Sequence, residues 1–120
     1  INIHGVNFSI GMRELRRQLA AAEHIIAAHP GPVIFSGDFN TWRSARMELI
    51  DETVNNLGLA ALEYDTDHRT RFFGWPLDHI YVRGLDAVIA TTYDLDSSDH
   101  NPMLVELRLL PDARAGLAQQ

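Results

Sequence analysis

The sequence contains no cysteine among its 120 residues. It can therefore form neither a disulfide framework nor a thiolate metal site, and this composition fits a reducing compartment. No apolar run approaches the roughly 20 residues needed to span a bilayer, and the first residues include no initiator methionine and no charged leader. We therefore expect a cytoplasmic location, and we expect the sequence to be the C-terminal part of a longer protein.

Basic residues are also fewer than acidic ones: 10 against 16, which gives a formal net charge of −6. This balance argues against tight, non-specific binding to nucleic acid. It does not exclude a nuclease, because a bound metal ion can reverse the electric field near a site. The length and the content of 46% hydrophobic and 22% charged residues are typical of one small globular domain.

Hydrophobic periodicity predicts two helices and several strands. A stripe of apolar residues predicts an amphipathic helix over residues 12–26, ended by the sequence at 29–32, and a second helix over 47–57 with Gly58 beyond its end. The predicted strands cover residues 1–8, 33–36, 59–64, 77–83, 85–93 and 103–109, and the longest loop covers 65–75.

The order of these elements predicts the fold class. Helices separate the early strands, whereas the late strands follow one another directly. This order favours an α/β (α+β) fold in which a mixed sheet has its helices on one face and leaves the other face bare. We expect the domain to cover residues 1–110 and the Ala- and Gln-rich residues 111–120 to form a frayed tail.

The first motif with chemical potential is Gly37-Asp38-Phe39-Asn40, which follows the apolar run 33–35. Asp38 and Asn40 have strand-like spacing and so point the same way. A carboxylate can orient a nucleophilic water, and a carboxamide can donate to a phosphoryl oxygen. The alternative is a simple turn, because three of the four residue types favour turns.

A second and a third motif supply a carboxylate and an imidazole. Asp78 lies in the apolar strand 77–83, where an unpaired carboxylate is costly, so it requires a partner. His100 can exchange a proton near neutral pH, although a lone histidine is more often structural. His79 should point to the opposite face from Asp78, and we interpret it as structural.

Two other chemistries fit poorly. A serine hydrolase built on Ser98 lacks the Gly-x-Ser-x-Gly elbow. Zinc binding by His4, His79 and His100 does not fit the spacing of a compact zinc motif.

Taken together, the three motifs resemble the endonuclease/exonuclease/phosphatase superfamily, whose members cut phosphoester bonds with a divalent metal. The motifs occur in the family's order, and the resemblance extends from His4 to Leu107. The stretch Phe73-Gly74-x-Pro76-Leu77-Asp78 is similar to that of uncharacterised bacterial members. The resemblance implies the C-terminal half of a DNase I-like four-layer α/β sandwich, whose N-terminal half would pack on the bare sheet face.

The resemblance also implies roles for individual residues. Asp38 would help to activate the attacking water, and Asn40 would steady the phosphate. Asp78 would pair with His100 and keep its ring oriented and cationic. His4 matches a histidine that contacts the phosphate or protonates the leaving oxygen.

Metal binding follows from the same resemblance. Asp99 matches an acid near the metal, although a turn or helix cap explains it equally well, and Asp38 is the other candidate ligand. The expected ion is Mg²⁺, with Mn²⁺ as an alternative. The family's main ligand, a glutamate, and a nearby asparagine would lie upstream of Ile1, and Glu63 and Glu106 lie away from the motifs. We therefore expect weak or absent Mg²⁺ binding by these residues alone.

Candidate substrate contacts are less specific than the motifs. Arginines suit phosphate recognition, and aromatic rings can stack on a base or cover an acyl chain. The candidates are Asn7, Trp42, Arg69, Arg71 and Trp75. The alternatives are a solvated loop for residues 69–75 and packing against the second helix for Trp42.

The partner is expected to be a phosphoester: nucleic acid, a nucleotide, an inositol phosphate or a phospholipid head group. A hypothesis from another class is an interaction module that keeps the fold without turnover. Its uncovered sheet face would bind the missing N-terminal half, another partner or a second copy of the chain.

Overall fold

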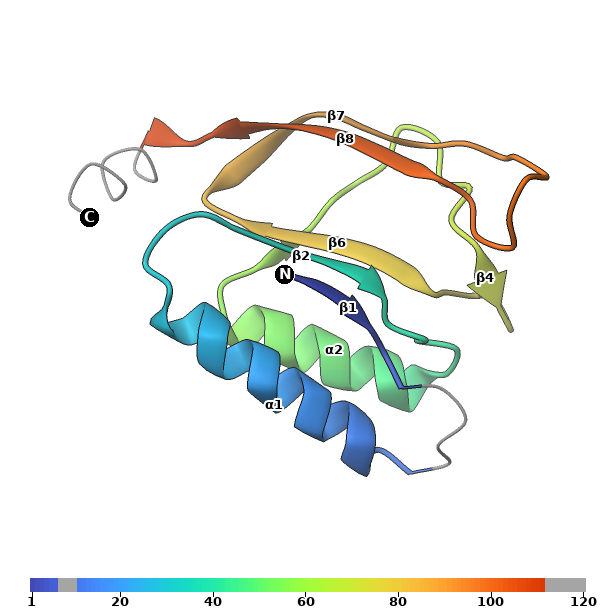
Figure 1. Cartoon of the computed structure of the whole chain (residues 1–120). Coiled ribbons are helices and arrows are strands. Elements are labelled where there is room, and N and C mark those ends of the chain that lie inside the picture. Colours follow the sequence, from blue (N-terminus) through green and yellow to red (C-terminus); the bar gives the residue numbers. More distant parts are fainter. Residues whose placement is uncertain (7–10, 112–120) are drawn as a thin grey trace.

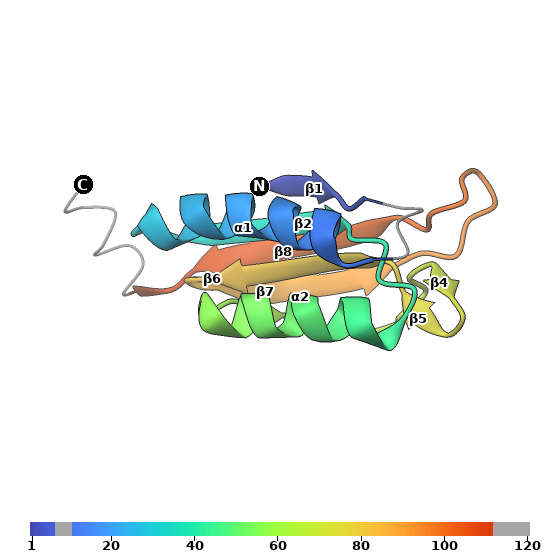
Figure 2. The same cartoon turned by 90° about the horizontal axis from the view of Figure 1, so that it is seen from below.

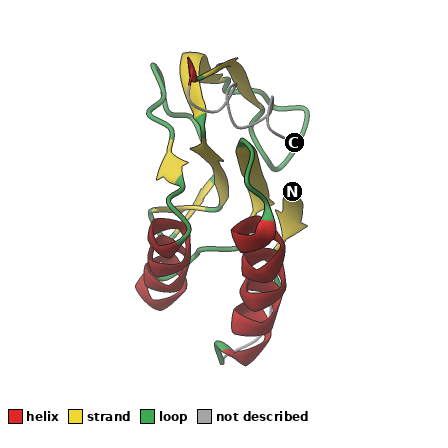
Figure 3. Cartoon of the chain, turned by 90° about the vertical axis from the view of Figure 1, so that its left-hand side faces the viewer, coloured by secondary structure: helices red, strands yellow, loops and turns green. Residues whose placement is uncertain are grey.

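A four-stranded sheet forms the centre of the molecule, and both helices lie on one side of it (Figures 1 and 3). The structure is a computed structural model, and it describes residues 1–6 and 11–111. Neither helix in this part of the chain is long and apolar enough to cross a bilayer. The elements are β1 (Asn2–His4), α1 (Arg13–Ala28), β2 (Val33–Asp38), α2 (Ser44–Asn56), β3 (Ala60–Ala61), β4 (Arg71–Phe72), β5 (Trp75–Pro76), β6 (Asp78–Arg83), β7 (Leu85–Thr92) and β8 (Met103–Leu109).

The central sheet has the strand order β1-β2-β6-β3. β1 runs parallel to β2, whereas β6 is antiparallel to both β2 and β3. The sequence prediction of a mixed α+β fold with helices on one face is therefore confirmed. β7 and β8 form an antiparallel hairpin, which lies on the opposite side of the sheet from the helices (Figures 1 and 2). That side, expected to be bare, is thus partly occupied.

The hydrophobic core lies between the helices and the central sheet. Four residues of α1 at spacings of three and four are buried, as the apolar stripe predicts. Phe35 of β2 is fully buried and packs edge-on against Phe39, with ring centroids 5.1 Å apart. The core residues are Leu15, Leu19, Ala22, Ile26, Val33, Phe35, Phe39, Leu49, Ile50, Val54, Leu59 and Tyr81.

Strand alternation decides which side chains face away from this core. In β2 the buried residues are Val33 and Phe35, so Asp38 has the opposite parity and faces the other side of the sheet. The same argument applies to β6, where Tyr81 packs in the core and Asp78 has the opposite parity. Burying these apolar residues therefore places Asp38 and Asp78 on the face away from the helices.

Three sequence predictions need correction. The strand predicted over 59–64 is limited to Ala60–Ala61, because the chain then turns to the hairpin, where the Asp65 amide donates to the Ala90 carbonyl (2.9 Å). The predicted loop 65–75 contains β4 and part of β5. The first strand ends at His4, and its predicted residues 7 and 8 lie outside the described ranges.

The β4–β5 turn was missed because its chemistry is unusual. Phe72 pairs with Trp75, which leaves Phe73 and Gly74 as the two central residues, with φ of 51° and 80°. Both values are positive, as a type I′ hairpin turn requires, and this turn normally starts with Asn, Asp or Gly. A phenylalanine in the first position gives no such signal.

Arg83 at the end of β6 connects the C-terminal ends of both helices. Its guanidinium donates to the carbonyl oxygens of Leu57 (3.1 Å), Ile26 (3.2 Å) and His29 (2.6 Å). The last carbonyls of a helix lack partners within the helix, and a cation beside them also complements the helix dipole. Arg83 therefore fixes both helices to the same strand.

We expect Arg83→Ala to lower the free energy of unfolding by about 2 kcal/mol, because hydrogen bonds to a charged group are lost. Arg108→Ala is the matched control. It removes only an exposed pair with Asp86 at 3.1 Å, and should cost less than about 1 kcal/mol. Urea unfolding followed by circular dichroism compares the two variants, and equal losses would contradict this role of Arg83.

Candidate active site

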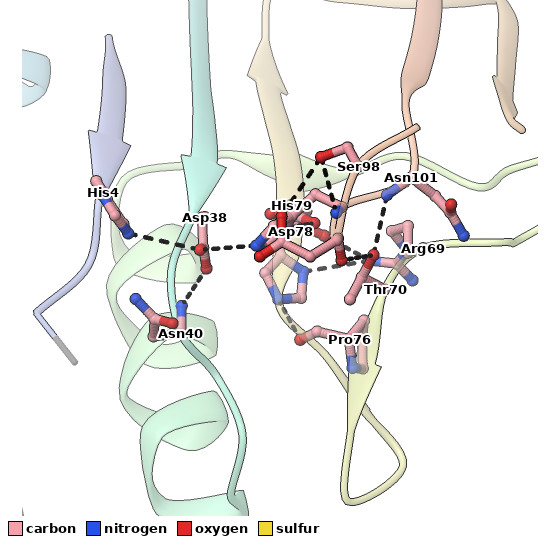
Figure 4. Close-up of polar contacts among 12 residues, drawn as sticks. His4, Asp38, Asn40, Arg69, Thr70, Pro76, Asp78, His79, Ser98 and Asn101 are labelled. Carbon is pink, nitrogen blue, oxygen red and sulfur yellow. Dashed lines mark hydrogen bonds and ion pairs between the residues drawn. The ribbon is translucent and has the colours of Figure 1, made fainter. Parts of the chain in front are cut away.

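The ends of three adjacent strands carry a row of ionisable side chains. In the sheet register His4 of β1 lies opposite Asp38 of β2, and Asp38 lies opposite Asp78 of β6. All three have the parity that faces away from the helices. Figure 4 shows His4, Asp38 and Asp78 side by side in this order. Residues far apart in the sequence thus form a single row across the sheet.

His100, from the loop before β8, bridges the two carboxylates of this row. Its Nδ1 lies 2.7 Å from Asp78 Oδ2, and its Nε2 lies 3.5 Å from Asp38 Oδ2. His4 Nε2 lies 3.6 Å from the same Asp38 oxygen. Two imidazoles therefore flank Asp38, and the site alternates imidazole and carboxylate groups.

The proton affinities of the pair reflect these contacts. The hydrogen bond to Asp78 raises the pKa of His100, and burial opposes this shift only in part. Burial also raises the pKa of Asp78, against the effect of its hydrogen bond with His100. A carboxylate at Nδ1 fixes the tautomer of the ring and favours its charged form, so His100 can hold or move a proton at Nε2.

The Gly-Asp-Phe-Asn segment is both a turn and part of this site. Gly37 has a φ of 144°, and a Cβ there would lie 1.9 Å from the Ile3 carbonyl oxygen, so only glycine fits beside β1. Asp38 Oδ1 accepts a hydrogen bond from the Asn40 amide at 2.9 Å. Its other oxygen, Oδ2, faces the two imidazoles. The turn interpretation and the site interpretation are therefore compatible.

Asn40 is buried, with 5% of its surface exposed. Its side-chain Nδ2 donates to the Gly5 carbonyl oxygen at 2.6 Å. This amide group thus holds the chain after β1, and the phosphate contact of Asn40 stays a prediction.

Asn101, which belongs to the same motif as His100, and Thr70, which the sequence did not single out, hold the loop of His100. The Asn101 amide donates to Thr70 Oγ1 (2.9 Å), and that hydroxyl donates to the Asp99 carbonyl oxygen (3.2 Å). Asn101 Nδ2 also donates to the His68 carbonyl oxygen at 2.7 Å. Thr and Asn side chains often form hydrogen bonds with backbone groups close to them in the sequence. This tendency was the available signal, but it does not indicate a partner far away in the sequence. Ser98 Oγ accepts the His100 amide at 3.2 Å.

His79 lies on the core side of β6, as strand alternation predicts. It is 5% exposed, and its Nε2 lies 2.7 Å from Thr41 Oγ1. Burial lowers the pKa of His79 to about 4, with the nearby Arg69 charge as a second cause. A neutral ring with its proton on Nε2 allows Nδ1 to accept from Arg69 Nη1 at 3.3 Å.

The structure places the predicted substrate contacts away from this row or binds them to other residues. Arg69 is bonded to Asp67 through Nε (2.9 Å) and Nη2 (2.8 Å). Arg71 contacts Asp67 and the Gly74 carbonyl oxygen. Trp42 lies beneath the guanidinium of Arg46 at 5.9 Å, beside α2. Trp75 is exposed on β5, and Asn7 lies outside the described residues.

An open groove of about 900 Å³ contains the row. It lies between the ends of β1, β2 and β6 and the segment that leads into β8. Among the residues singled out from the sequence, its lining includes His4, Asp38, Asn40, Asp78, Asp99 and His100.

Two carboxylates and one imidazole form a group in the described residues that could hold a metal ion. Asp38, Asp78 and His100 place ligand atoms within 4.8 Å of one another. However, Asp78 and His100 are bonded to each other at 2.7 Å, so Asp38 is the group whose oxygen is most open to an ion. Asp99 lines the same groove without joining this cluster.

Comparison with known proteins gives a consistent result. A family model described as endonuclease/exonuclease/phosphatase family matches residues 1–100. A UPF0294 protein of Vibrio parahaemolyticus is 41% identical over 91% of this chain and 39% of its own length. UPF0294 proteins of Yersinia enterocolitica and Vibrio cholerae are 44% identical over 90% and 92% of this chain and 42% and 40% of their own lengths. The chain thus spans about two fifths of these relatives. No solved structure matches it.

We expect His100→Gln to destabilise the fold most in the weakly acidic range. The raised pKa of His100 means that its pair with Asp78 contributes fully below 6.5 and is lost as pH rises through the folded-state value. Ionised Asp78 is also required, and its raised pKa makes the contribution fade in acid. Urea unfolding should show a larger loss at about pH 6 than at about pH 9.

The control for this measurement is His24→Gln on the exposed side of α1. It should change stability little at either pH. A loss for His100→Gln that is equal or larger at the alkaline pH would contradict the pairing.

Proposed function

The chain belongs to the endonuclease/exonuclease/phosphatase family, and we propose that it carries part of the active site of a phosphoester hydrolase. The reaction would be in-line attack of water on phosphorus. The observation that supports this most strongly is the row of His4, Asp38, Asp78 and His100 along one groove, with Asp38 between two imidazoles at 3.5 and 3.6 Å.

Each group has a role that follows from its contacts. Asp38 Oδ2 is an acceptor at the centre of the row and would orient the attacking water. His100, held cationic through Nδ1 by Asp78, would present Nε2 to a phosphoryl oxygen or to a proton in transfer. His4 is 81% exposed and would reach the opposite side of the same phosphate. Asn40 would donate its remaining amide proton.

The donor set fits a divalent metal held chiefly by Asp38. Mg²⁺ is usually bound by one or two carboxylates, with water and substrate phosphate filling the other positions. When bound, the ion would stabilise the negative charge that develops on the phosphoryl group. Because the chain covers about two fifths of its relatives, we propose that further ligands come from other parts of a longer protein.

The net charge of the chain limits the classes of phosphoester that we propose as substrates. A formal charge of −6 disfavours broad contact with a duplex backbone. We therefore propose a substrate smaller than duplex DNA, such as a nucleotide, an inositol phosphate or a lipid head group, as the first choice for assay.

A second candidate is a binding module without turnover, and exposed apolar side chains favour it. Val88 and Leu104 on the hairpin are 54% and 53% exposed, and Ile34 on β2 is 43% exposed. Such residues fit burial against the rest of a longer protein or a second copy. Sedimentation distinguishes these cases, because self-pairing gives a concentration-dependent dimer and a strict monomer excludes it.

His100→Ala should lower phosphoester hydrolysis by about 10²- to 10⁴-fold in the longer protein, because the row loses its proton-holding group. Activity is measured on a panel of phosphodiesters and phosphomonoesters with Mg²⁺ or Mn²⁺. His24→Ala, which alters an exposed histidine of α1, is the control. A loss below tenfold would remove His100 from the reaction.

We also expect these 120 residues alone to bind Mg²⁺ with a Kd weaker than about 1 mM, because Asp38 is the main oxygen donor available to the ion. Isothermal titration calorimetry measures this directly. Micromolar affinity that is lost in Asp38→Asn would show a complete site within this chain and contradict the expectation.

A further inference from the structure

The short segment His4–Val6 is held in place mainly through its backbone. β1 has three residues and lies at the edge of its sheet, so the sheet alone constrains the chain weakly after His4. Yet the Gly5 amide donates to the Asp38 carbonyl oxygen at 2.6 Å. Asn40 Nδ2 donates to the Gly5 carbonyl oxygen at 2.6 Å. Both contacts connect this segment to the end of β2, which carries Asp38, and to the residues that follow it.

A residue of α1 binds the same segment from another direction. Gln18 Nε2 donates to the His4 carbonyl oxygen at 3.1 Å, and Gln18 Oε1 accepts the Val6 amide at 2.7 Å. The two ends of one carboxamide thus satisfy a backbone acceptor and a backbone donor that lie two residues apart. This arrangement fixes the backbone directly around His4.

A residue of α2 completes these contacts. Arg46 has no exposed surface, and its Nη2 donates to the Val6 carbonyl oxygen at 2.5 Å while its Nε donates to the Asn40 carbonyl oxygen at 2.7 Å. One guanidinium therefore joins the segment after His4 to the segment after Asp38. Burial lowers the pKa of Arg46, because taking a charged group out of water is costly.

Neither Gln18 nor Arg46 lines the groove, yet together they bind the backbone on both sides of the His4–Asp38 contact. His4 itself is held only loosely by its side chain, which is 81% exposed. The position of its ring therefore depends on the backbone that carries it.

We propose that Gln18 and Arg46 are positioning residues, which hold the His4 imidazole at its working distance from Asp38. This inference rests on the proposed function, because it gives the His4–Asp38 contact a role in hydrolysis. Small misplacements of a reacting group can cost about 10²-fold in rate, which gives the fold a reason to constrain such an exposed side chain.

The central test is a double-mutant cycle. Gln18→Ala should lower kcat by about tenfold or more with little change in KM, since the reacting groups rather than the binding surface are displaced. In a His4→Ala background the same change should cost less than twofold, because it acts through His4. Arg17→Ala, an exposed neighbour on α1, is the matched control and should leave kcat unchanged. Full additivity of the two losses would overturn the proposal.

A second readout does not need activity. Asp38→Asn should change the NMR chemical shifts of the His4 ring, and this response should fall to less than half when Gln18→Ala is added. An undiminished response would overturn the positioning role even in an active protein. If no phosphoester is hydrolysed but the response does fall, the proposed function fails while the positioning of His4 stands.

Arg46→Lys tests the other residue, since lysine keeps the charge but cannot donate in two fixed directions. Circular dichroism first establishes that it folds, and the same NMR response should then fall as it does for Gln18→Ala. A folded variant with an unchanged response would exclude Arg46, and Gln18 would remain decisive if the variant does not fold.

Discussion

The register between β2 and β6 sets a constraint on which the rest of the site depends. It places Asp38 directly opposite Asp78, and like charges in facing positions destabilise a sheet. Asp78 is also buried, where an uncompensated carboxylate is costly. The imidazole of His100 lies against both carboxylates. Its hydrogen bond with Asp78 and the negative charges of both acids raise the pKa of His100. The two acids thus require a positive charge beside them, which a protonated His100 ring supplies.

The rest of the fold positions the acids and histidines of this row. Burial of alternate residues in β2 and β6 turns their acids away from the helices. Thr70 and Asn101 fix the loop of His100, and Gln18 and Arg46 fix the backbone after His4. Two faces of the central sheet therefore do different work. One face packs the helices and gives stability, and the other carries the ionisable groups that line the groove.

Much of this arrangement could be predicted from the sequence, because it depends on local patterns. Periodicity gave the helices, alternation separated Asp78 from His79, and the motifs indicated Asp38, Asn40 and His100. The contacts that hold the groups could not be predicted this way. In the sequence, Arg46 looks like an ordinary helix residue and Thr70 like an ordinary loop residue. Their hydrogen-bond partners are backbone atoms of distant segments, which no local pattern indicates. The turn at Phe73 and Gly74 was not predicted for another reason. Phenylalanine rarely adopts a positive φ, so its presence at the first turn position does not indicate this type of turn.

The chain covers about two fifths of its relatives, and the proposal that other parts of a longer protein complete the site rests on this coverage. The arrangement of the site depends on the contacts of His100 with Asp38 and Asp78. Its most direct test is the pKa of His100 measured by NMR in the native chain, in Asp78→Asn and in Asp38→Asn. We predict a value above the ordinary 6.5, a clear decrease in Asp78→Asn and a smaller decrease in Asp38→Asn. A native pKa at or below 6.5, or no response to Asp78→Asn, would contradict it.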